Sequence, residues 1–543
     1  MPTVAQQFAR TLKEIGVRFV FGVPSGNMTD YIESLRLEDG IEFILVGHET
    51  TAAFMAAICG RLTGIPGICF GTFGPGATNL TTGVGCAFLD RFPMIAFTDE
   101  MPDHLLSRTV QMNIDHQTLF SPITKWTTRL NCNNISETIL KAGGISVSEI
   151  PGPVHIGVPA GIGLMKAEVL ISQVNYLRLE KQFSQEVLYD SLTKAKSKFQ
   201  NAKKPLLVVG LSAVRSQVGN LIILLAEKFN LPVVLTPMAK GLVPENHRLY
   251  TGVLFHALSN HVAKTYNEAD LIIGIGYDPI EFNYEDWMPR VPLIHLSKQI
   301  ADIDREEYAD VIDVVGELKK ILGKLINFST KEKNWDNELL IARKNKMFQK
   351  FVPADGNFGP LAVVEELRRA LPDDGILTVD VGAHLHLIGQ MWRTPAPEKL
   401  LITNGWSSMG FAIPAALAAK LCNPELPVAA IMGDGGFLMA VGELATAKRL
   451  KLKIVFIVIY DNSLSLIRIK QDKKDYNKNY GTDLNELQEI PTNHYFGVPV
   501  FRTTNSTEYQ KALKEAFLIN GPSVIEAIVD GSEYDDLVLK PNK

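Results

Sequence analysis

The chain has 543 residues, which is too long for one hydrophobic core and predicts several domains. Its composition is that of an ordinary globular protein, with 46% hydrophobic and 21% charged residues. The formal net charge of −5 is small for this length, so we expect neither a nucleic acid nor a membrane as a partner. The five cysteines are scattered and lack metal-ligand spacing, which favours reduced thiols in a cytoplasmic protein. The N-terminal segment carries charges inside its apolar pattern, so we expect no signal peptide.

The first third of the chain alternates short apolar runs with amphipathic stretches. This pattern predicts helices at 4–15 and 51–64 and strands at 17–23, 43–46, 67–72 and 154–158. Strands separated by helical lengths predict a parallel sheet with helices on both faces. We place the first domain at residues 1–165, followed by a linker over 166–185.

Two further units of the same kind follow. The second begins near Lys204 and is predicted to have strands at 206–210, 231–236, 271–277 and 293–296, where it ends. A lysine- and asparagine-rich stretch to about residue 351 predicts a helical or irregular linker. The third unit has predicted strands at 376–381, 428–432, 454–459 and 523–528. The fold class is therefore α/β with three doubly wound parallel-sheet domains, the second at 186–328 and the third at 357–543.

The segment Gly433-Asp434-Gly435-Gly436 lies between a predicted strand and a predicted helix. Glycines at such a junction let backbone N–H groups approach an anion, and a helix N-terminus adds a favourable dipole. Asp434 at the strand end could bind a cation that bridges phosphate groups. When the segment is taken alone, a plain turn is the better interpretation of Gly-Asp-Gly.

A second polar segment, Asp461-Asn462-Ser463, ends the next predicted strand, 27 residues after Asp434. Adjacent parallel strands end side by side at the carboxyl edge of a sheet, where ligands bind. The candidate metal ligands are therefore Asp434, Asp461 and the Ser463 carbonyl, with Asn462 beside them. Diphosphate oxygens and water would complete the octahedron that Mg²⁺ requires.

These residues at this interval resemble the thiamine-diphosphate motif of the family of acetolactate synthases, pyruvate oxidases and 2-oxo acid decarboxylases. In that family the motif begins Gly-Asp-Gly and usually closes with two asparagines. Here Asp461 takes the place of the first asparagine, as it does in the catabolic, flavin-free acetolactate synthases. The resemblance implies thiamine diphosphate and Mg²⁺ as cofactors. It also implies that the three domains are pyrimidine-binding, central and diphosphate-binding.

Gly47-His48-Glu49-Thr50 lies where the family carries its activating glutamate. The resemblance implies that Glu49 shares a proton with the pyrimidine ring of the cofactor and so promotes deprotonation of its thiazolium carbon. Without the other motifs, a carboxylate at a helix N-terminus would be the simpler interpretation of Glu49.

Further segments match the family in the same order along the chain. Met409 matches the methionine that bends the cofactor, and the Ser407 carbonyl matches the acceptor of its amine. His384 lies in the loop that matches the diphosphate side, and Leu464 lies beside the predicted metal ligands. The full set of candidate cofactor-binding residues is Pro24, Gly26, Glu49, Gly74, Asn79, His384, Ser407, Met409, Gly433, Gly435, Gly436 and Leu464.

The substrate side departs from the acetolactate-synthase pattern. Gln111 keeps one residue of a family segment, and His116 adds a group that could relay protons, so both are candidate catalytic residues. A solvated polar loop is the alternative interpretation of each. Leu464 and Ile467 predict an apolar pocket that would suit 2-oxo acids bulkier than pyruvate.

The leading hypothesis is a transferase of the acetolactate-synthase type, which decarboxylates pyruvate and adds the two-carbon unit to a second carbonyl. The alternatives are a 2-oxo acid decarboxylase or acyloin lyase, and a catalytically silent relative that only binds the cofactor. In the family the two halves of the active site come from different subunits, so the resemblance implies an obligatory homodimer and commonly a homotetramer. The Arg-Phe-Asp-Asp-Arg segment that contacts flavin is missing, so we expect no bound FAD.

Overall fold

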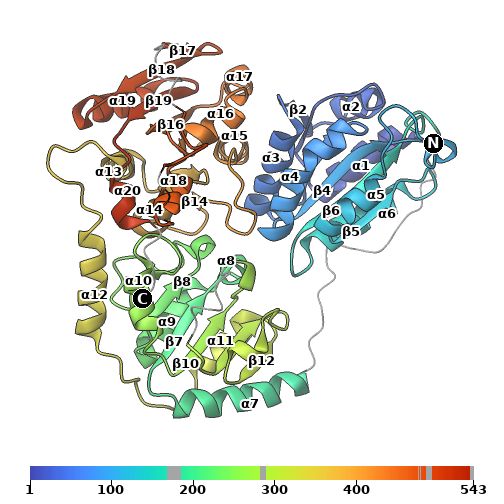
Figure 1. Ribbon diagram of the computed structural model, residues 1–543. Coiled ribbons are helices and arrows are strands. Elements are labelled where there is room, and N and C mark those ends of the chain that lie inside the picture. The colour runs from blue at the N-terminus through green and yellow to red at the C-terminus, as the bar shows by residue number, and fades with distance from the viewer. Residues whose placement is uncertain (168–184, 282–288, 475, 477, 485–491, 539–543) are drawn as a thin grey trace.

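The computed structural model describes residues 1–167, 185–281, 289–474, 476, 478–484 and 492–538. Three α/β domains follow one another along the chain, each built on its own sheet of mostly parallel strands. In Figure 1 the central domain lies below the other two, and the helix α12 (Asn337–Gln349) lies between it and the C-terminal domain along the chain. The predicted fold class is confirmed. Of the predicted linker over 166–185, only residues 166, 167 and 185 lie within the described residues.

The N-terminal domain contains a six-stranded parallel sheet in the order β2-β1-β3-β4-β6-β5. β3 and β4 are buried along their whole length, as expected for strands covered by helices on both faces. The strands are β1 (Phe19–Gly22), β2 (Glu42–Leu45), β3 (Gly67–Gly71), β4 (Met94–Glu100), β5 (Trp126–Arg129) and β6 (Pro153–Pro159). The helices are α1 (Val4–Ile15), α2 (Thr29–Arg36), α3 (Glu49–Thr63), α4 (Pro75–Leu89), α5 (His116–Phe120) and α6 (Ile135–Val147).

The central domain contains a second six-stranded parallel sheet, in the order β12-β11-β10-β7-β8-β9. Its strands are β7 (Pro205–Val209), β8 (Val233–Leu235), β9 (Tyr250–Val253), β10 (Leu271–Ile275), β11 (Leu293–Ser297) and β12 (Val311–Val315). Its helices are α7 (Gln185–Asn201), α8 (Leu211–Arg215), α9 (Gly219–Phe229), α10 (Ser259–Tyr266) and α11 (Leu318–Ile326). The helix α12 (Asn337–Gln349) follows, which confirms the helical interpretation of the second linker.

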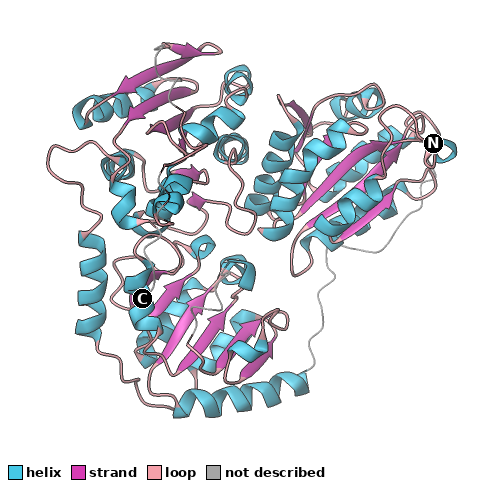
Figure 2. Cartoon of the chain, in the orientation of Figure 1, coloured by secondary structure: helices cyan, strands magenta, loops and turns pink. Residues whose placement is uncertain are grey.

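The C-terminal domain contains a seven-stranded sheet in the order β14-β13-β15-β16-β19-β18-β17, in which only the β17–β18 pair is antiparallel. Its strands are β13 (Ile376–Val379), β14 (Leu400–Leu401), β15 (Val428–Gly433), β16 (Ile454–Tyr460), β17 (His494–Tyr495), β18 (Val498–Thr503) and β19 (Ser523–Ile528). Its helices are α13 (Pro360–Ala370), α14 (Ala383–Met391), α15 (Ala412–Cys422), α16 (Asp434–Ala440), α17 (Glu443–Arg449), α18 (Ser465–Asp472), α19 (Ser506–Leu518) and α20 (Glu533–Leu537). Figure 2 shows helices on both faces of each sheet.

The structure adds strands that the sequence pattern did not predict. The central sheet does not end at residue 296, because β12 pairs in parallel with β11 beyond it. The strands β4, β5, β9, β14, β17 and β18 were also missed. The three sheets span residues 19–159, 205–315 and 376–528, and we propose 1–165, 186–328 and 357–543 as the bounds of the domains that contain them.

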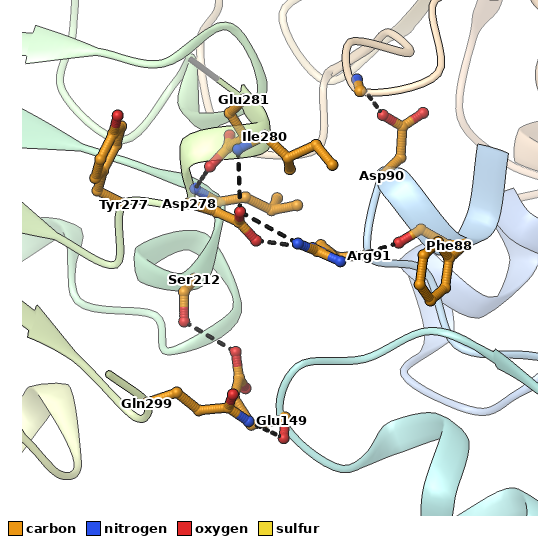
Figure 3. A network of polar contacts seen from close by, with 12 residues as sticks. Phe88, Asp90, Arg91, Glu149, Ser212, Tyr277, Asp278, Ile280, Glu281 and Gln299 are labelled. Atoms are coloured by element: carbon orange, nitrogen blue, oxygen red, sulfur yellow. Dashed lines mark hydrogen bonds and ion pairs between the residues drawn. The ribbon is translucent and has the colours of Figure 1, made fainter. Parts of the chain in front are cut away.

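Polar contacts join the N-terminal and central domains. Arg91, after α4, donates to Asp278 of the central domain with its Nε at 2.8 Å from Oδ2 (Figure 3). Glu149, before β6, accepts from Ser212 of α8 at 3.2 Å, and its carbonyl accepts from Gln299. These contacts fix the central domain against the N-terminal one. Of the helices in the described residues, none has the length and apolar character that a membrane-spanning segment needs.

Candidate active site

The strands β15 and β16 are neighbours in the C-terminal sheet, and each is followed directly by an aspartate. Gly433 pairs with Ile459, so Asp434 and Asp461 follow at the same edge of the sheet. Asp434 is 2% exposed, and its Oδ2 accepts from the Asn462 N–H at 2.8 Å. The structure therefore brings these two predicted metal ligands together, as expected from adjacent parallel strand ends.

The loop after β16 turns back toward Asp434. Asn462 has a φ of 58°, and its carbonyl accepts from the Leu484 N–H at 2.8 Å. The Ser463 N–H donates to Asp461 Oδ1 at 3.2 Å, while the Ser465 hydroxyl donates to Asp461 Oδ2. Within the described ranges, Asn462 Oδ1 and Ser463 Oγ are buried without a hydrogen-bond partner. Unsatisfied buried oxygens are uncommon and indicate a missing ligand.

The donor set fits a divalent cation. Burial, together with the negative charge of the neighbouring Asp461, raises the pKa of Asp434 to about 7. Burial also raises the pKa of Asp461 above its ordinary value. Two carboxyl groups that are costly to ionise side by side become favourable ligands when a cation lies between them. Oxygen ligands of this kind suit Mg²⁺.

A cavity of about 200 Å³ opens beside the two aspartates, and its lining contains residues 381–384, 407, 409, 433–436 and 463–467. Gly435 forms part of its floor: a Cβ added there would lie 2.6 Å from Leu464 Cδ2 and 3.2 Å from Met409 Cε. Met409 and Leu464, far apart in sequence, thus meet over one glycine. The structure gathers these candidate cofactor-binding residues at one cavity.

His384 and Ser407 also line this cavity. Burial lowers the pKa of His384 to about 4, so its imidazole is neutral at physiological pH. In the part of the chain that the structure describes, His384 Nε2 has no hydrogen-bond partner, although it is buried. The ring packs against Gly382, where an added Cβ would lie 2.7 Å from its Cε1. A neutral imidazole carries a single N–H, so it can donate to an anionic ligand here as the tautomer with its proton on Nε2.

Asp380, which the sequence reasoning passed over, organises this half of the site. It directly follows β13, and burial raises its pKa to about 6. Its carboxyl oxygens accept from the N–H groups of Gly410 and Ala412, each at 2.9 Å. A Cβ added at Gly436 would lie 2.7 Å from Asp380 Oδ1. Asp380 therefore fixes the loop that carries Met409 against the start of α16.

Asp90 is a second residue that was missed, and it acts across domains. This N-terminal-domain residue is 1% exposed. It accepts from the Thr403 hydroxyl at 2.5 Å and from the Gly405 N–H at 2.7 Å. Beside it, a Cβ added at Gly85 of α4 would lie 2.6 Å from the Trp406 ring. The segment before Ser407 is thus held by the N-terminal domain of the same chain.

Glu49 is the first residue of α3, at the carboxyl edge of the N-terminal sheet. The preceding His48 caps the helix, because its Nδ1 accepts from the Thr50 N–H at 3.2 Å. Asn79 Nδ2 donates to Glu49 Oε2 at 3.0 Å, and a Cβ added at Gly76 would lie 3.3 Å from Glu49 Oε1. Glu49 and Asn79, both predicted site residues, are therefore in direct contact.

Gly74 lies in the loop that precedes α4 and has a φ of 42°. Its N–H donates to His116 Nε2 at 3.3 Å, and a Cβ added at Gly74 would lie 2.9 Å from the Met112 carbonyl oxygen. Gln111, next to Met112, is exposed. His116 is buried instead, which differs from the solvated loop that was the alternative interpretation.

Pro24 and Gly26 lie in the turn after β1, both exposed at the same sheet edge. Between them Ser25 donates to Asp99 Oδ2 at 2.5 Å, which fixes this turn to the end of β4. Burial raises the pKa of Asp99 to about 6. The N-terminal candidates therefore form one surface at the ends of β1 to β4.

The N-terminal and C-terminal candidates form two separate halves within one chain. All residues that line the cavity beside Asp434 belong to the C-terminal domain. Among the described residues, Glu49 and Asn79 contact each other and do not line that cavity. One chain thus presents both halves without joining them there.

Comparison with known proteins identifies all three domains. The thiamine pyrophosphate enzyme N-terminal TPP binding domain matches residues 2–119, the central domain 192–325, and the C-terminal TPP binding domain 380–527. The acetolactate synthase of Bacillus subtilis is 30% identical over 536 residues, covering 97% of this chain and 93% of that protein. A probable acetolactate synthase large subunit of Methanocaldococcus jannaschii is 29% identical, over 97% and 92%. The Escherichia coli acetolactate synthase isozyme 1 large subunit is 27% identical, over 98% and 94%. The chain therefore belongs to the thiamine pyrophosphate (thiamine diphosphate) enzyme family and is an enzyme that depends on this cofactor.

Proposed function

We propose that this protein is an acetolactate-synthase-like transferase that uses thiamine diphosphate and Mg²⁺. It would decarboxylate pyruvate and join the two-carbon unit to a second 2-oxo acid. The observation that carries the proposal is the pair of buried aspartates, Asp434 and Asp461, at adjacent strand ends beside a glycine-floored cavity. The relatives named acetolactate synthase, which match nearly the whole chain, support the choice of reaction.

Each group around the cavity has a distinct task in this proposal. Asp434, Asp461 and the Ser463 carbonyl hold the metal ion, and His384 donates its N–H to the diphosphate. Met409 and Leu464 support the cofactor from the side of Gly435. When bound, the cofactor supplies a carbon nucleophile and an electron sink for the decarboxylation of a 2-oxo acid.

We propose that Glu49 reaches the cofactor from a second copy of the chain, which makes a homodimer obligatory. Its carboxyl group would hold or release a proton at the pyrimidine ring, while Asn79 keeps it oriented. Exposed apolar side chains on the C-terminal domain near the cavity support an interface there, namely Leu438, Met439 and Ile467. Two such dimers would form a homotetramer.

The proposal also includes a cytoplasmic location and a protein that binds no FAD. Five free cysteines support a cytoplasmic location. The segment around Asp278 and Glu281 is occupied by contacts to Arg91, Leu211 and Thr236, which supports a protein without FAD.

A decarboxylase or acyloin lyase would share all of these cofactor contacts. It is favoured by the partly exposed Ile467 and by Leu464, which make the pocket apolar. The two activities differ in whether the pocket positions a second carbonyl or a proton donor.

Product analysis separates the candidates. Metal-stripped protein is incubated with thiamine diphosphate, Mg²⁺ and pyruvate, and acetolactate is measured against free acetaldehyde. Acetolactate as the main product supports the synthase, whereas acetaldehyde, or a strong preference for bulky 2-oxo acids, supports the alternative. No CO₂ release from any 2-oxo acid, together with no cleavage of acyloins to aldehydes, would overturn both and leave a silent cofactor-binding relative.

Mixed dimers test the shared site. A dimer purified through two different tags has one chain with Asp434→Asn and the other with Glu49→Gln. Each homodimer is expected to be inactive, while the mixed dimer keeps one native site and about half of the wild-type rate. A mixed dimer as inactive as its parents would contradict a site shared between subunits.

A further inference from the structure

Glu443 is a buried carboxyl group that joins the C-terminal domain to the loop before Glu49. It is the first residue of α17 and is 3% exposed. Its Oε1 and Oε2 accept from the Gly47 N–H at 3.0 and 3.1 Å, and its Oε2 also accepts from the Thr446 hydroxyl at 2.7 Å. Both of these groups are donors, so the carboxyl group accepts in each of these hydrogen bonds.

The approach of Glu443 to Gly47 is close. A Cβ added at Gly47 would lie 3.0 Å from Glu443 Oε1, so a larger residue at that position would displace the Glu443 carboxyl group slightly. At the other end of α17, Arg449 donates to the Leu45 carbonyl. One short helix therefore holds the end of β2 at two backbone groups, two residues apart.

These contacts bear directly on Glu49, which lies two residues after Gly47. The next anchor along the chain is His48, which caps α3. On the far side of Glu49 stands Asn79, whose carbonyl also accepts from the Thr50 hydroxyl at 2.6 Å. Without Glu443, the backbone N–H of Gly47 would lose its acceptor, and the turn that aims Glu49 would lose its anchor on the C-terminal side.

Glu443 is also close in sequence to the metal ligand Asp434. The helix α16 begins at Asp434, and α17 begins nine residues later at Glu443. The two consecutive helices α16 and α17 thus begin at the metal site of their own chain and reach the loop that carries Glu49 of the same chain.

We propose that Glu443 is a positioning residue for Glu49, and that it serves the active site of the partner subunit rather than that of its own chain. The inference rests on the proposed function, in which Glu49 completes the cofactor site of the other copy. Each C-terminal domain then has two tasks: it holds the metal and the diphosphate for one site, and through Glu443 it orients the glutamate that acts in the other.

Mixed dimers can assign the task to one chain. In the parent mixed dimer, the donor chain carries Asp434→Asn and supplies Glu49, whereas the holder chain carries Glu49→Gln and binds the cofactor. Only one site is complete. Glu443→Gln is then placed either in the donor chain or in the holder chain, and the rate of the single site is measured in each.

We expect Glu443→Gln in the donor chain to lower the rate at least about tenfold, because a neutral amide oxygen is a weaker acceptor than a carboxylate and the new NH₂ group faces donors. In the holder chain it should change the rate by less than about twofold. A larger loss of rate in the holder chain than in the donor chain would show that Glu443 acts through α16 on its own metal site, and it would overturn the proposal. Equal loss in both chains would show a general structural role and overturn it as well. If the parent mixed dimer is itself inactive, the shared-site proposal fails instead.

A second measurement needs no cofactor and no activity. Hydrogen exchange of the Gly47 amide, followed by mass spectrometry of peptides spanning residues 43–50 in the apo dimer, should be at least about tenfold faster with Glu443→Gln. Peptides from β15 and β16 should exchange as in the wild type. Glu443→Asp keeps the charge on a shorter side chain and should give the same pattern if Glu443→Gln folds poorly. Unchanged exchange at Gly47 in both variants would refute the anchoring contact.

Discussion

Thr98 allows a quantitative test of the polar network that holds His116. The hydroxyl of Thr98 lies 2.9 Å from His116 Nδ1 and 2.8 Å from His155 Nε2, and all three side chains are buried. Because the Gly74 N–H donates to His116 Nε2, His116 must carry its proton on Nδ1 and donate to Thr98. Thr98 in turn donates to His155.

The other end of the network fixes the same direction. Gln117 Nε2 donates to the carboxyl group of Glu100, so its Oε1 is left to accept from Thr127, at 2.7 Å. Thr127 can then only accept from His155 Nδ1, also at 2.7 Å. His155 Nε2 therefore carries no proton, as the first end of the network requires. The two ends agree without any free choice of tautomer.

Thr98→Val replaces the hydroxyl by a methyl group of similar size. It leaves His116 Nδ1 and His155 Nε2 buried without partners, and each costs about 1–3 kcal/mol. The total of about 2–6 kcal/mol should lower the melting temperature of the N-terminal domain by about 4–24 °C. Thr98→Ser keeps the hydroxyl and loses only a methyl group, so its melting temperature should fall by a few degrees at most.

Differential scanning calorimetry of the apo protein measures both variants. The expected order, with serine closer to the wild type than valine, is opposite to the order that apolar packing in a buried strand would give. A Thr98→Val protein within about 2 °C of the wild type, or more stable than Thr98→Ser, would refute the hydrogen-bond assignment.

Three other substitutions test neighbouring conclusions. Burial lowers the pKa of His116 to about 4, below its ordinary value of 6.5. The unfolded chain therefore binds the proton more strongly than the folded one, and the stability of the fold decreases as the pH drops from about 6.5 to 4. The loss is about 3 kcal/mol, and His116→Gln should make the melting temperature less dependent on pH between 7 and 5 in calorimetry. Gly435→Ala should push Leu464 into the cavity and weaken the binding of thiamine diphosphate, measured by titration calorimetry, at least about tenfold. Gly442→Ala is the control: an added Cβ has open space there, so this variant should bind thiamine diphosphate normally. Asp380→Asn loses one acceptor for the loop at 410–412, and hydrogen exchange there should become at least about fivefold faster; unchanged exchange would contradict its clamping role.

The C-terminal half of the site could be predicted because its determinants are local in sequence. The strands β15 and β16 are long, buried apolar runs, and each is followed at once by an aspartate. Parallel pairing of two such strands places Asp434 and Asp461 side by side without further information. Gly435 could be predicted from its position in the same turn alone.

The residues that were missed act across domains. Asp90 accepts from Gly405, 315 residues away, and Glu443 accepts from Gly47, 396 residues away. In sequence each is an ordinary acidic residue at a helix end, and no periodicity marks its partner. The missed strand β12 has a related cause: only Val314 in it is fully buried, and Asp313 interrupts its apolar pattern.

Asp90 and Glu443, which were missed, share one physical task with the predicted residue His116. Loops that leave the carboxyl ends of parallel strands carry backbone N–H groups that the sheet does not use. In this chain, buried acceptors take up those groups: His116 at Gly74, Glu443 at Gly47, and Asp90 at Gly405.

A loop fixed in this way has little backbone freedom left to lose when a ligand or a second subunit arrives. We therefore expect the two half-sites to be ordered in each chain before assembly. Dimerisation then costs little loop entropy, and burial of the exposed apolar side chains around the cavity favours it.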